Sequence, residues 1–492
     1  MIRQMYAFLL ALFVSLAMAG AAQKSQGPAR TDPSTRLPVT TSSAKARERF
    51  EVAMADMEQA RYSRSADDLR SAVKADPKFA QAWILIARVS TDPEEQKGAR
   101  TRARQLAPSV TRPEQLLIRW FSCAQENNYV PAIAAMNDLL GKYPKDQRLA
   151  FLAGDWLIPQ QRYEQAAKVL ERAVTLDPDY PAALNDLGYA YALTGNFEKA
   201  FAAMDRYVAV APDQPNPHDS YGEFLRMTGK FDAALDQYRI SIRMDPGFGS
   251  ELGVADTYAL MGKEEEAREE YERAMVFAAT PSDRIQYQLQ SAVTWIRENR
   301  RKEAEKALAQ VAVDASKAGL VRLEAEAHRV LALYEPDYKL TLKHLQEADG
   351  ALQQRREISA SDRDEEQARI LQVRAEKAIE ARNMDAAAAA EKQLETMAGS
   401  SPSQVIQLCY HAAEGAVLLA RQEYPDAISH LEEDSDDPLS MQLLWRAYSS
   451  TGATAQAQAL ASKLASLNVP TAEQALVVPQ FRANLLSQAR QP

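Results

Sequence analysis

The sequence has few cysteines and few glycines. Only two of its 492 residues are cysteines and 18 are glycines. Cys123 and Cys409 lie far apart along the chain, so a disulfide between them is improbable and both are expected to be small buried apolar residues. Val, Ile and Thr are sparse outside short patches, while Ala, Leu, Glu, Gln and Arg are abundant. This bias favours helix over strand and predicts an all-α protein.

Motifs that carry catalysis, bind phosphate or hold a metal are also missing. The sequence has no H-E-x-x-H, no G-x-S-x-G, no G-x-x-x-x-G-K-[ST] and no C-x-x-C. None of the five histidines has another histidine or a cysteine at a metal-ligand spacing, so no metal and no cofactor are predicted: they are His218, His328, His344, His411 and His430.

The chain has fewer basic than acidic residues. The chain carries 58 basic and 67 acidic residues, a formal net charge of -9. An acidic chain is a poor generic nucleic-acid binder, because phosphate neutralisation needs clusters of Lys and Arg. The densest acidic run, residues 432–437, lacks the Gly and the terminal Glu of a calcium loop. It is expected to be a solvated turn, with Asp437 or Ser440 near a helix start.

The first residues have the features of an export signal. Arg3 precedes an apolar stretch that ends near Ala17, and small residues follow at the two candidate cleavage sites, after Ala19 and after Ala21. The stretch is too short for an ordinary membrane-spanning helix, although an uncleaved anchor stays an alternative. We therefore expect a signal peptide at residues 1–22 and a bacterial protein that is periplasmic or secreted. Residues 23–43, rich in Ser, Thr, Gln and Pro, are expected to be a flexible linker.

The rest of the chain is predicted to be helix after helix with an internal period. Four prolines, at 144, 178, 212 and 246, are spaced by 34 residues each. Between them the same pattern recurs, and in residues 181–214 it consists of Leu184, Leu187, Gly188, Tyr191, Gly195, Ala200, Met204 and Pro212. A small residue on each helix lets the two helices of a repeat cross closely, and bulky residues at helical spacing fill the layers between them.

At these residues the sequence resembles the tetratricopeptide repeat family. The resemblance implies an α-solenoid, a right-handed superhelix of about twelve tetratricopeptide and similar helix pairs with a C-terminal capping helix. We expect the tetratricopeptide array at residues 44–281, degenerate helical repeats at 282–468 and the cap at 469–492. Because repeats occupy nearly the whole chain, no stretch of catalytic-domain size is left, and we predict that the protein is not an enzyme.

The resemblance also implies that the first helix of each repeat lines a concave groove. Carried onto the best repeats, the groove positions are Phe151, Asp155, Asn185, Tyr189, Asp219, Glu223, Arg226, Leu252 and Asp256. The set is mainly acidic, which favours a partner polypeptide with basic and apolar side chains. Some family members clamp a C-terminal carboxylate at such positions, but the acidic residues here would repel one.

Two functions follow as hypotheses. The first is an exported scaffold that mediates protein–protein interaction or complex assembly in the cell envelope. The second is a periplasmic α-solenoid that binds a solute or a cell-wall fragment. A continuous open groove favours the first, and a closed aromatic pocket favours the second.

Overall fold

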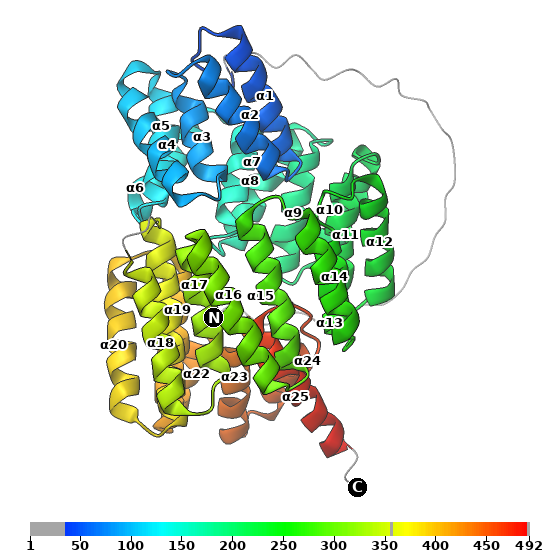
Figure 1. Cartoon of the computed structure of the whole chain (residues 1–492), viewed down its shortest axis with the longest axis vertical. Helices are drawn as coiled ribbons and strands as arrows, with labels where there is room; N and C mark the ends of the chain where they lie inside the picture. Colours follow the sequence, from blue (N-terminus) through cyan, green and yellow to red (C-terminus); the bar gives the residue numbers. More distant parts are fainter. Residues whose placement is uncertain (1–34, 355–357, 490–492) are drawn as a thin grey trace.

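The computed structural model describes residues 35–354 and 358–489, and all regular secondary structure in these residues is helical. The predicted signal peptide and most of the predicted linker lie outside the described residues. Among the described residues, 24 α-helices form twelve consecutive pairs and one α-helix follows them, as the sequence predicts. Figure 1 shows the pairs stacked side by side along the chain.

The first six pairs span residues 44–244. Their helices are α1 (Ala44–Glu58), α2 (Tyr62–Ala75), α3 (Ala80–Val89), α4 (Pro93–Leu106), α5 (Arg112–Ala124), α6 (Tyr129–Lys142), α7 (Gln147–Leu157), α8 (Tyr163–Leu176), α9 (Pro181–Leu193), α10 (Phe197–Val210), α11 (Pro215–Met227) and α12 (Phe231–Met244).

The remaining pairs and the last helix span residues 251–489. They are α13 (Glu251–Leu260), α14 (Glu264–Phe277), α15 (Pro281–Arg297), α16 (Arg301–Ala318), α17 (Val321–Tyr334), α18 (Tyr338–Leu352), α19 (Ala360–Glu380), α20 (Met384–Ser400), α21 (Gln404–Ala420), α22 (Tyr424–Glu433), α23 (Pro438–Ser450), α24 (Thr454–Ala465) and α25 (Ala472–Ala489). No helix of the described residues has the length and apolar character needed to cross a membrane.

Most pairs share one turn geometry between their two helices. A residue with positive φ ends the first helix, and it is glycine at 195, 229, 262 and 452. At the same place in other pairs the structure has Ala60, Asn127, Gln161, Asn299, Arg382 and Gln422, with φ between 55° and 64°. Glycine adopts this left-handed conformation without a steric cost, whereas other residues are held there by surrounding contacts. The turn therefore persists where the sequence pattern fades.

The two helices of a pair cross closely at a small residue. A side chain at Gly188 would meet Met204 and Phe224, and one at Gly154 would meet Leu170. Between pairs, Gly253 of α13 lies against the ring of Tyr238 of α12, which is 1% exposed. These contacts bury one face of each helix in a core that continues from pair to pair, as expected for a stack whose units cannot bury their apolar faces alone.

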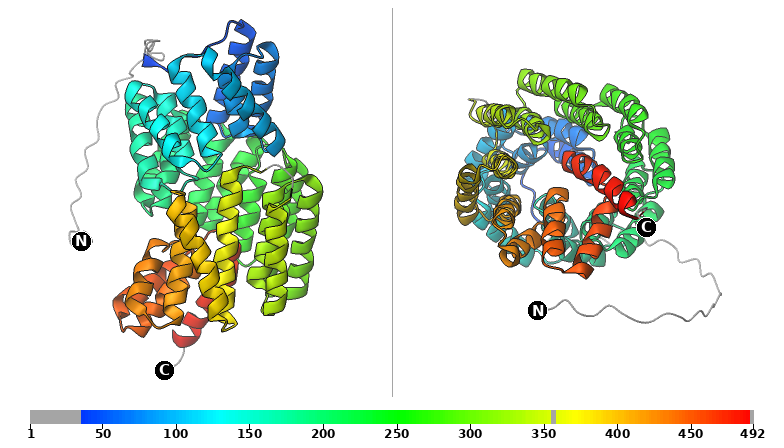
Figure 2. Two further views of the ribbon diagram at one scale, coloured as in Figure 1. Left: turned by 90° about the vertical axis from the view of Figure 1, so that its left-hand side faces the viewer. Right: turned by 90° about the horizontal axis from the view of Figure 1, so that it is seen from below.

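The superhelix is wound so tightly that segments far apart in the sequence are in contact. The turn between α5 and α6 meets the start of α19, where Asn127 Nδ2 donates to Asp364 Oδ2 at 2.5 Å and the Tyr129 hydroxyl donates to Glu365 Oε1 at 2.9 Å. Arg162 Nη2 donates to the carbonyl oxygen of Pro402 at 3.0 Å. Viewed from one end, the helices enclose an interior (Figure 2).

The last helix lies inside this superhelix. In the end-on view of Figure 2, α25 runs from the middle of the ring of helices to its rim. It contacts α15, α23 and α24, so it covers the last pair and also reaches the middle of the array. Phe481 packs with the core of α22–α24, whereas Ala475 packs with the core of α15–α17. Glu473 Oε1 lies 3.4 Å from Arg329 Nη1 of α17.

We expect Gly253→Ala to lower the free energy of unfolding by about 1–3 kcal/mol, because its new methyl group would overlap the fully buried ring of Tyr238. Gly141→Ala is the matched control: Gly141 is exposed on α6 with no atom within 4 Å of an added Cβ, so this variant should be as stable as the wild type or slightly more so. Urea unfolding followed by circular dichroism measures both. Equal midpoints for the two variants would contradict the helix packing described here.

Candidate functional site

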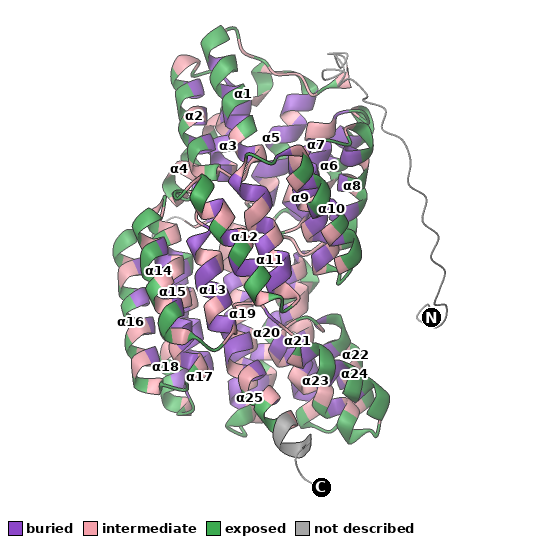
Figure 3. Ribbon diagram, turned by 90° about the vertical axis from the view of Figure 1, so that its right-hand side faces the viewer, coloured by how far each residue is buried: buried purple, intermediate pink, exposed green. Residues whose placement is uncertain are grey.

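The inner face of the superhelix is formed by the first helix of each pair. The odd-numbered helices of neighbouring pairs also touch one another, as α7 touches α9 and α11 touches α13. Helix α25, inside the superhelix, contacts α15 and α23. Buried residues gather along inner helices such as α11 and α13 (Figure 3). The predicted groove positions all lie on inner helices, namely α7, α9, α11 and α13.

Residues 35–43, which we call the chain's own N-terminal segment, lie against the starts of two inner helices, α5 and α7. The Leu37 N–H donates to Asp146 Oδ2 at 2.7 Å, and the Thr40 N–H donates to Glu114 Oε1 at 2.7 Å. The Thr40 hydroxyl also donates to Glu114 Oε2 at 2.6 Å, and the Leu37 and Val39 side chains pack against the core. The prediction of a flexible linker is therefore wrong for residues 35–43, because fixed carboxylates and an apolar surface hold this part in place.

The carboxylates of Asp146 and Glu114 are also held by hydrogen bonds at the starts of their own helices. Asp146 Oδ1 accepts from the Leu149 N–H at 3.0 Å and so caps the start of α7. Glu114 is fully buried and Oε2 accepts from the Thr111 N–H at 3.0 Å in the capping box of α5. Their oxygens are thus preorganised as acceptors for backbone N–H groups.

A cavity of about 250 Å³ lies beside the segment. Its walls come from the segment itself, from α1, α3, α5 and α7, and from Tyr180 before α9, and its apolar members are Leu37, Val39, Phe50, Met54, Leu85, Leu117, Leu149 and Leu152. Arg148 lies at its edge and donates to Glu58 at 2.7 Å and to Glu51 at 2.9 Å. Gln81 Oε1, on the cavity wall, is buried and has no hydrogen-bond partner among the described residues.

The predicted groove residues on α9, α11 and α13 are largely paired with one another. The Tyr189 hydroxyl donates to Glu223 Oε2 at 2.6 Å, and Arg226 donates to Glu223 at 2.8 Å and to Asp256 at 3.3 Å. The Tyr271 hydroxyl of α14 donates to Asp256 Oδ1 at 2.5 Å. This network joins three consecutive pairs, so these carboxylates hold neighbouring repeats together, and few of them are left to bind a basic partner.

The other predicted positions have different surroundings. Phe151 is 2% exposed and packs edge-on against Tyr180, so it belongs to the core and its assignment to the groove surface was wrong. Asp155 forms an ion pair with Arg88. Asn185 is buried and accepts from the Ser220 hydroxyl at 2.7 Å. Leu252 is half-buried against the core of α13 and α14.

Burial on the inner face weakens the acidity of its carboxyl groups. It raises the pKa of Asp186 to about 7, that of Asp219 to about 7 and that of Asp256 to about 6. Asp186 Oδ2 has no hydrogen-bond partner among the described residues, and the Asn185 Nδ2 bond to Oδ1 at 3.2 Å and the charge of Arg88 offset the cost of charging it only in part. Near neutral pH these groups are partly protonated, and the inner face is less negative than its sequence suggests.

The acidic run at 432–437 is not a wholly solvated turn. Asp437 caps the start of α23, as expected, and accepts from the Leu439 N–H at 2.9 Å and the Ser440 N–H at 3.1 Å. Asp434, in contrast, is 8% exposed and accepts from the Ser440 hydroxyl at 2.5 Å. Burial raises its pKa well above the usual range.

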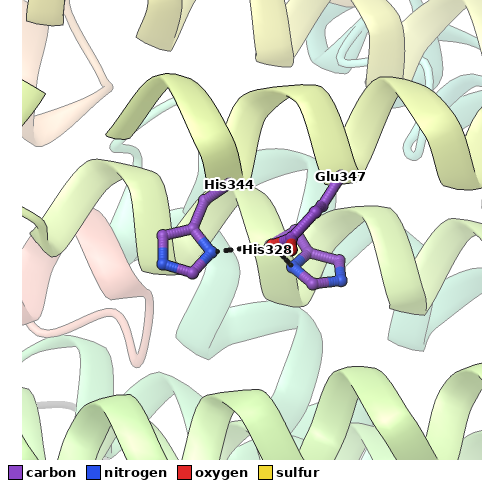
Figure 4. Close-up of side chains that lie close together, drawn as sticks. All are labelled: His328, His344 and Glu347. Carbon is purple, nitrogen blue, oxygen red and sulfur yellow. Dashed lines mark hydrogen bonds and ion pairs between the residues drawn. The ribbon is translucent and has the colours of Figure 1, made fainter. Parts of the chain in front are cut away.

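Four of the five histidines meet in pairs, which the sequence analysis missed. His411 Nδ1 lies 3.2 Å from His430 Nδ1, and His328 and His344 gather around Glu347 (Figure 4). In each pair one histidine comes from the first helix of a repeat and the other from the second. Facing positions on the two helices of a pair are separated by many residues in the sequence. Histidines at that separation would have indicated both pairs, whereas short motif spacings do not.

A family model agrees with the repeat pattern. Residues 153–219 match the family model described as tetratricopeptide repeat. A thermophilic TPR protein of Thermus thermophilus is 20% identical over 41% of this chain and 98% of its own, with a TM-score of 0.32. Yeast Tom70 is 13% identical over 85% of this chain and 98% of its own, with a TM-score of 0.43. No curated protein matches the chain.

We expect Asp186→Asn to raise the melting temperature at pH 8 and to leave it nearly unchanged near pH 4. The pKa of Asp186 is raised from 3.8 to about 7 in the folded chain, so the folded state binds this proton more tightly than the unfolded state. The contribution of this group to stability therefore falls as pH rises from about 4 to about 7. The exposed Asp213→Asn is the control. A pH-independent difference between Asp186→Asn and wild type in thermal melts would contradict the assignment.

Proposed function

We propose that this tetratricopeptide-repeat protein is a scaffold that binds extended polypeptide segments on the inner face of its first four helix pairs. Tetratricopeptide repeats generally mediate protein–protein interaction or complex assembly, and the fold is typically non-catalytic. The observation that carries the proposal is the position of residues 35–41. This segment is held as a bound peptide would be, by backbone hydrogen bonds and by apolar side chains beside a cavity.

The backbone hydrogen bonds supply affinity, and the apolar side-chain contacts supply selectivity. Backbone N–H groups are present in every peptide except at proline, so Asp146 and Glu114 can hold a segment whatever its sequence. Leu37 and Val39 are two residues apart, as alternate side chains of an extended chain are when they face one surface. A partner segment with apolar residues at this spacing would fill the same positions.

The charges around the cavity add a preference for positive groups. Glu51 and Glu58 share the single guanidinium of Arg148, so this edge carries one more negative than positive side chain. Arg36 of the chain's own segment also lines the cavity. These features support a partner with basic and apolar residues in an extended segment, as the sequence analysis expects.

The alternative of a solute-binding or cell-wall-binding module has weaker support. A cavity of about 250 Å³ is slightly smaller than the ligand pockets of roughly 300–1,000 Å³ that small molecules occupy. Its aromatic lining consists of Phe50 and Tyr180, and the Tyr180 hydroxyl is engaged by Glu58 at 3.0 Å. A pocket suited to a sugar ring would need more aromatic ring faces left open to the ligand.

We further propose that the protein acts in the cell envelope after export. The proposal rests on the features of residues 1–22: a basic residue, an apolar stretch and small residues at two cleavage positions.

A labelled peptide with the sequence of residues 35–42 tests the peptide site. In the wild type the chain's own segment competes at a high effective concentration, so the free peptide should bind weakly. The double variant Leu37→Asp and Val39→Asp should release that segment and bind the peptide about tenfold more tightly or better, measured by fluorescence anisotropy on the full chain.

Two controls make this test specific. A peptide carrying the same two Asp substitutions should not bind the released groove. Adding Asp146→Asn to the double variant should weaken binding of the normal peptide, because the acceptor of the Leu37 N–H loses its charge. If the released groove fails to bind the peptide although the variant is folded, the proposed site is refuted.

Processing of the N-terminus tests the export proposal. We expect the chain expressed with its own first residues in a Gram-negative host to appear in the periplasmic fraction with Gly20 or Ala22 as its new N-terminus. Intact-mass spectrometry of the purified protein measures this. Recovery of an unshortened chain from the membrane fraction would favour the uncleaved anchor, and recovery from the cytosol would contradict export.

A further inference from the structure

His328, His344 and Glu347 form a compact cluster between α17 and α18. His328 lies on α17, and the other two lie about one helical turn apart on α18. Glu347 Oε2 lies 3.1 Å from His344 Nδ1 and 3.3 Å from His328 Nδ1. One ligand atom from each residue can be chosen so that all three lie within 4.8 Å of one another. Figure 4 shows the carboxylate of Glu347 between the two imidazole rings.

These separations suit coordination of a metal ion. Zinc binds imidazole nitrogen and carboxylate oxygen at roughly 2.0–2.2 Å, so tetrahedral ligand atoms lie about 3.3–3.5 Å apart. The two distances to Glu347 Oε2, 3.1 and 3.3 Å, are close to that edge. Two imidazoles and one carboxylate are also a donor set typical of zinc and related divalent ions.

One imidazole nitrogen of the cluster is left without a hydrogen bond in the described part of the chain. His328 Nδ1 is buried and has no hydrogen-bond partner among the described residues, although Glu347 lies within ion-pair distance. An unpaired buried nitrogen that faces a carboxylate and a second imidazole would be satisfied by a bound cation.

The two oxygens of Glu347 have different neighbours. Oε1 lies 3.7 Å from Lys343 Nζ, whereas Oε2 lies between the two imidazoles. Lys343 therefore orients the carboxylate from the side away from the histidines. Near His328, Glu324 adds a negative charge and Lys343 a positive one.

We propose that His328, His344 and Glu347 bind one divalent transition-metal ion of the zinc class. Their side chains are 18%, 20% and 36% exposed, so a fourth coordination position is open to water or to a side chain of a binding partner. The bound ion joins α17 to α18 in the half of the chain where the repeat pattern is weakest. The site is independent of the peptide site on the first four pairs.

The pair His411 and His430 provides an internal control. Their Nδ1 atoms lie 3.2 Å apart on α21 and α22, but in the described residues no carboxylate joins them in a three-ligand group. A two-histidine site holds a metal more weakly than one with three protein ligands. The same chain thus contains a complete donor set and an incomplete one of similar exposure.

Calorimetric titration of the full chain, purified without a histidine tag, with ZnCl₂ tests the proposal. We expect one ion per chain, with at least tenfold weaker binding in His344→Ala and in the isosteric Glu347→Gln, and unchanged binding in His430→Ala. Zinc should also raise the melting temperature of the wild type but not of Glu347→Gln, because an ion that binds only the folded chain stabilises it. Absorption bands of Co²⁺ report nitrogen and oxygen coordination directly.

Circular dichroism establishes that each variant is folded. If His344→Ala does not fold, Glu347→Gln still tests the proposal. The proposal is overturned if the wild type binds no ion saturably, or if all three variants bind zinc as the wild type does. It is equally overturned if only His430→Ala loses binding, since the ion would then belong to the other histidine pair.

Discussion

The whole structure depends on the close crossing of the two helices within each pair. Small residues such as Gly188 and Gly154 permit that crossing, and the left-handed turn between the helices sets its direction. Each pair still leaves an apolar face uncovered, so the next pair must stack on it. The inner face, with its fixed carboxylates and cavity, is a product of this stacking, because each of its walls comes from a different pair.

The helix pairs could be predicted from the sequence because their pattern is local. The spacing of 34 residues between prolines and the glycine turns marked the middle repeats clearly. Weaker repeats kept the turn with residues such as Arg382 and Gln422, whose left-handed conformation no local pattern predicts. The placement of α25 inside the superhelix was equally hidden, since its contacts with α15 join segments that are distant in the sequence.

The candidate sites were harder to predict than the fold. The sequence located the inner helices, but it could not show that Glu223 and Asp256 are already bound by Arg226, or that Phe151 is buried. It also gave no sign that residues 35–41 would lie against Asp146 and Glu114. These features arise between repeats, where a side chain's partner depends on superhelical geometry, and pattern and composition carry no information on that geometry.

Helix α25 and the contacts between distant pairs have a mechanical consequence. A solenoid of stacked helix pairs can lengthen through small rotations between neighbouring pairs. Here α25 links α15 to α23 across the interior, and Asn127, Tyr129 and Arg162 fasten one coil to the next. Because stretching would have to break these links, we expect the molecule to resist elongation more than a solenoid that lacks them.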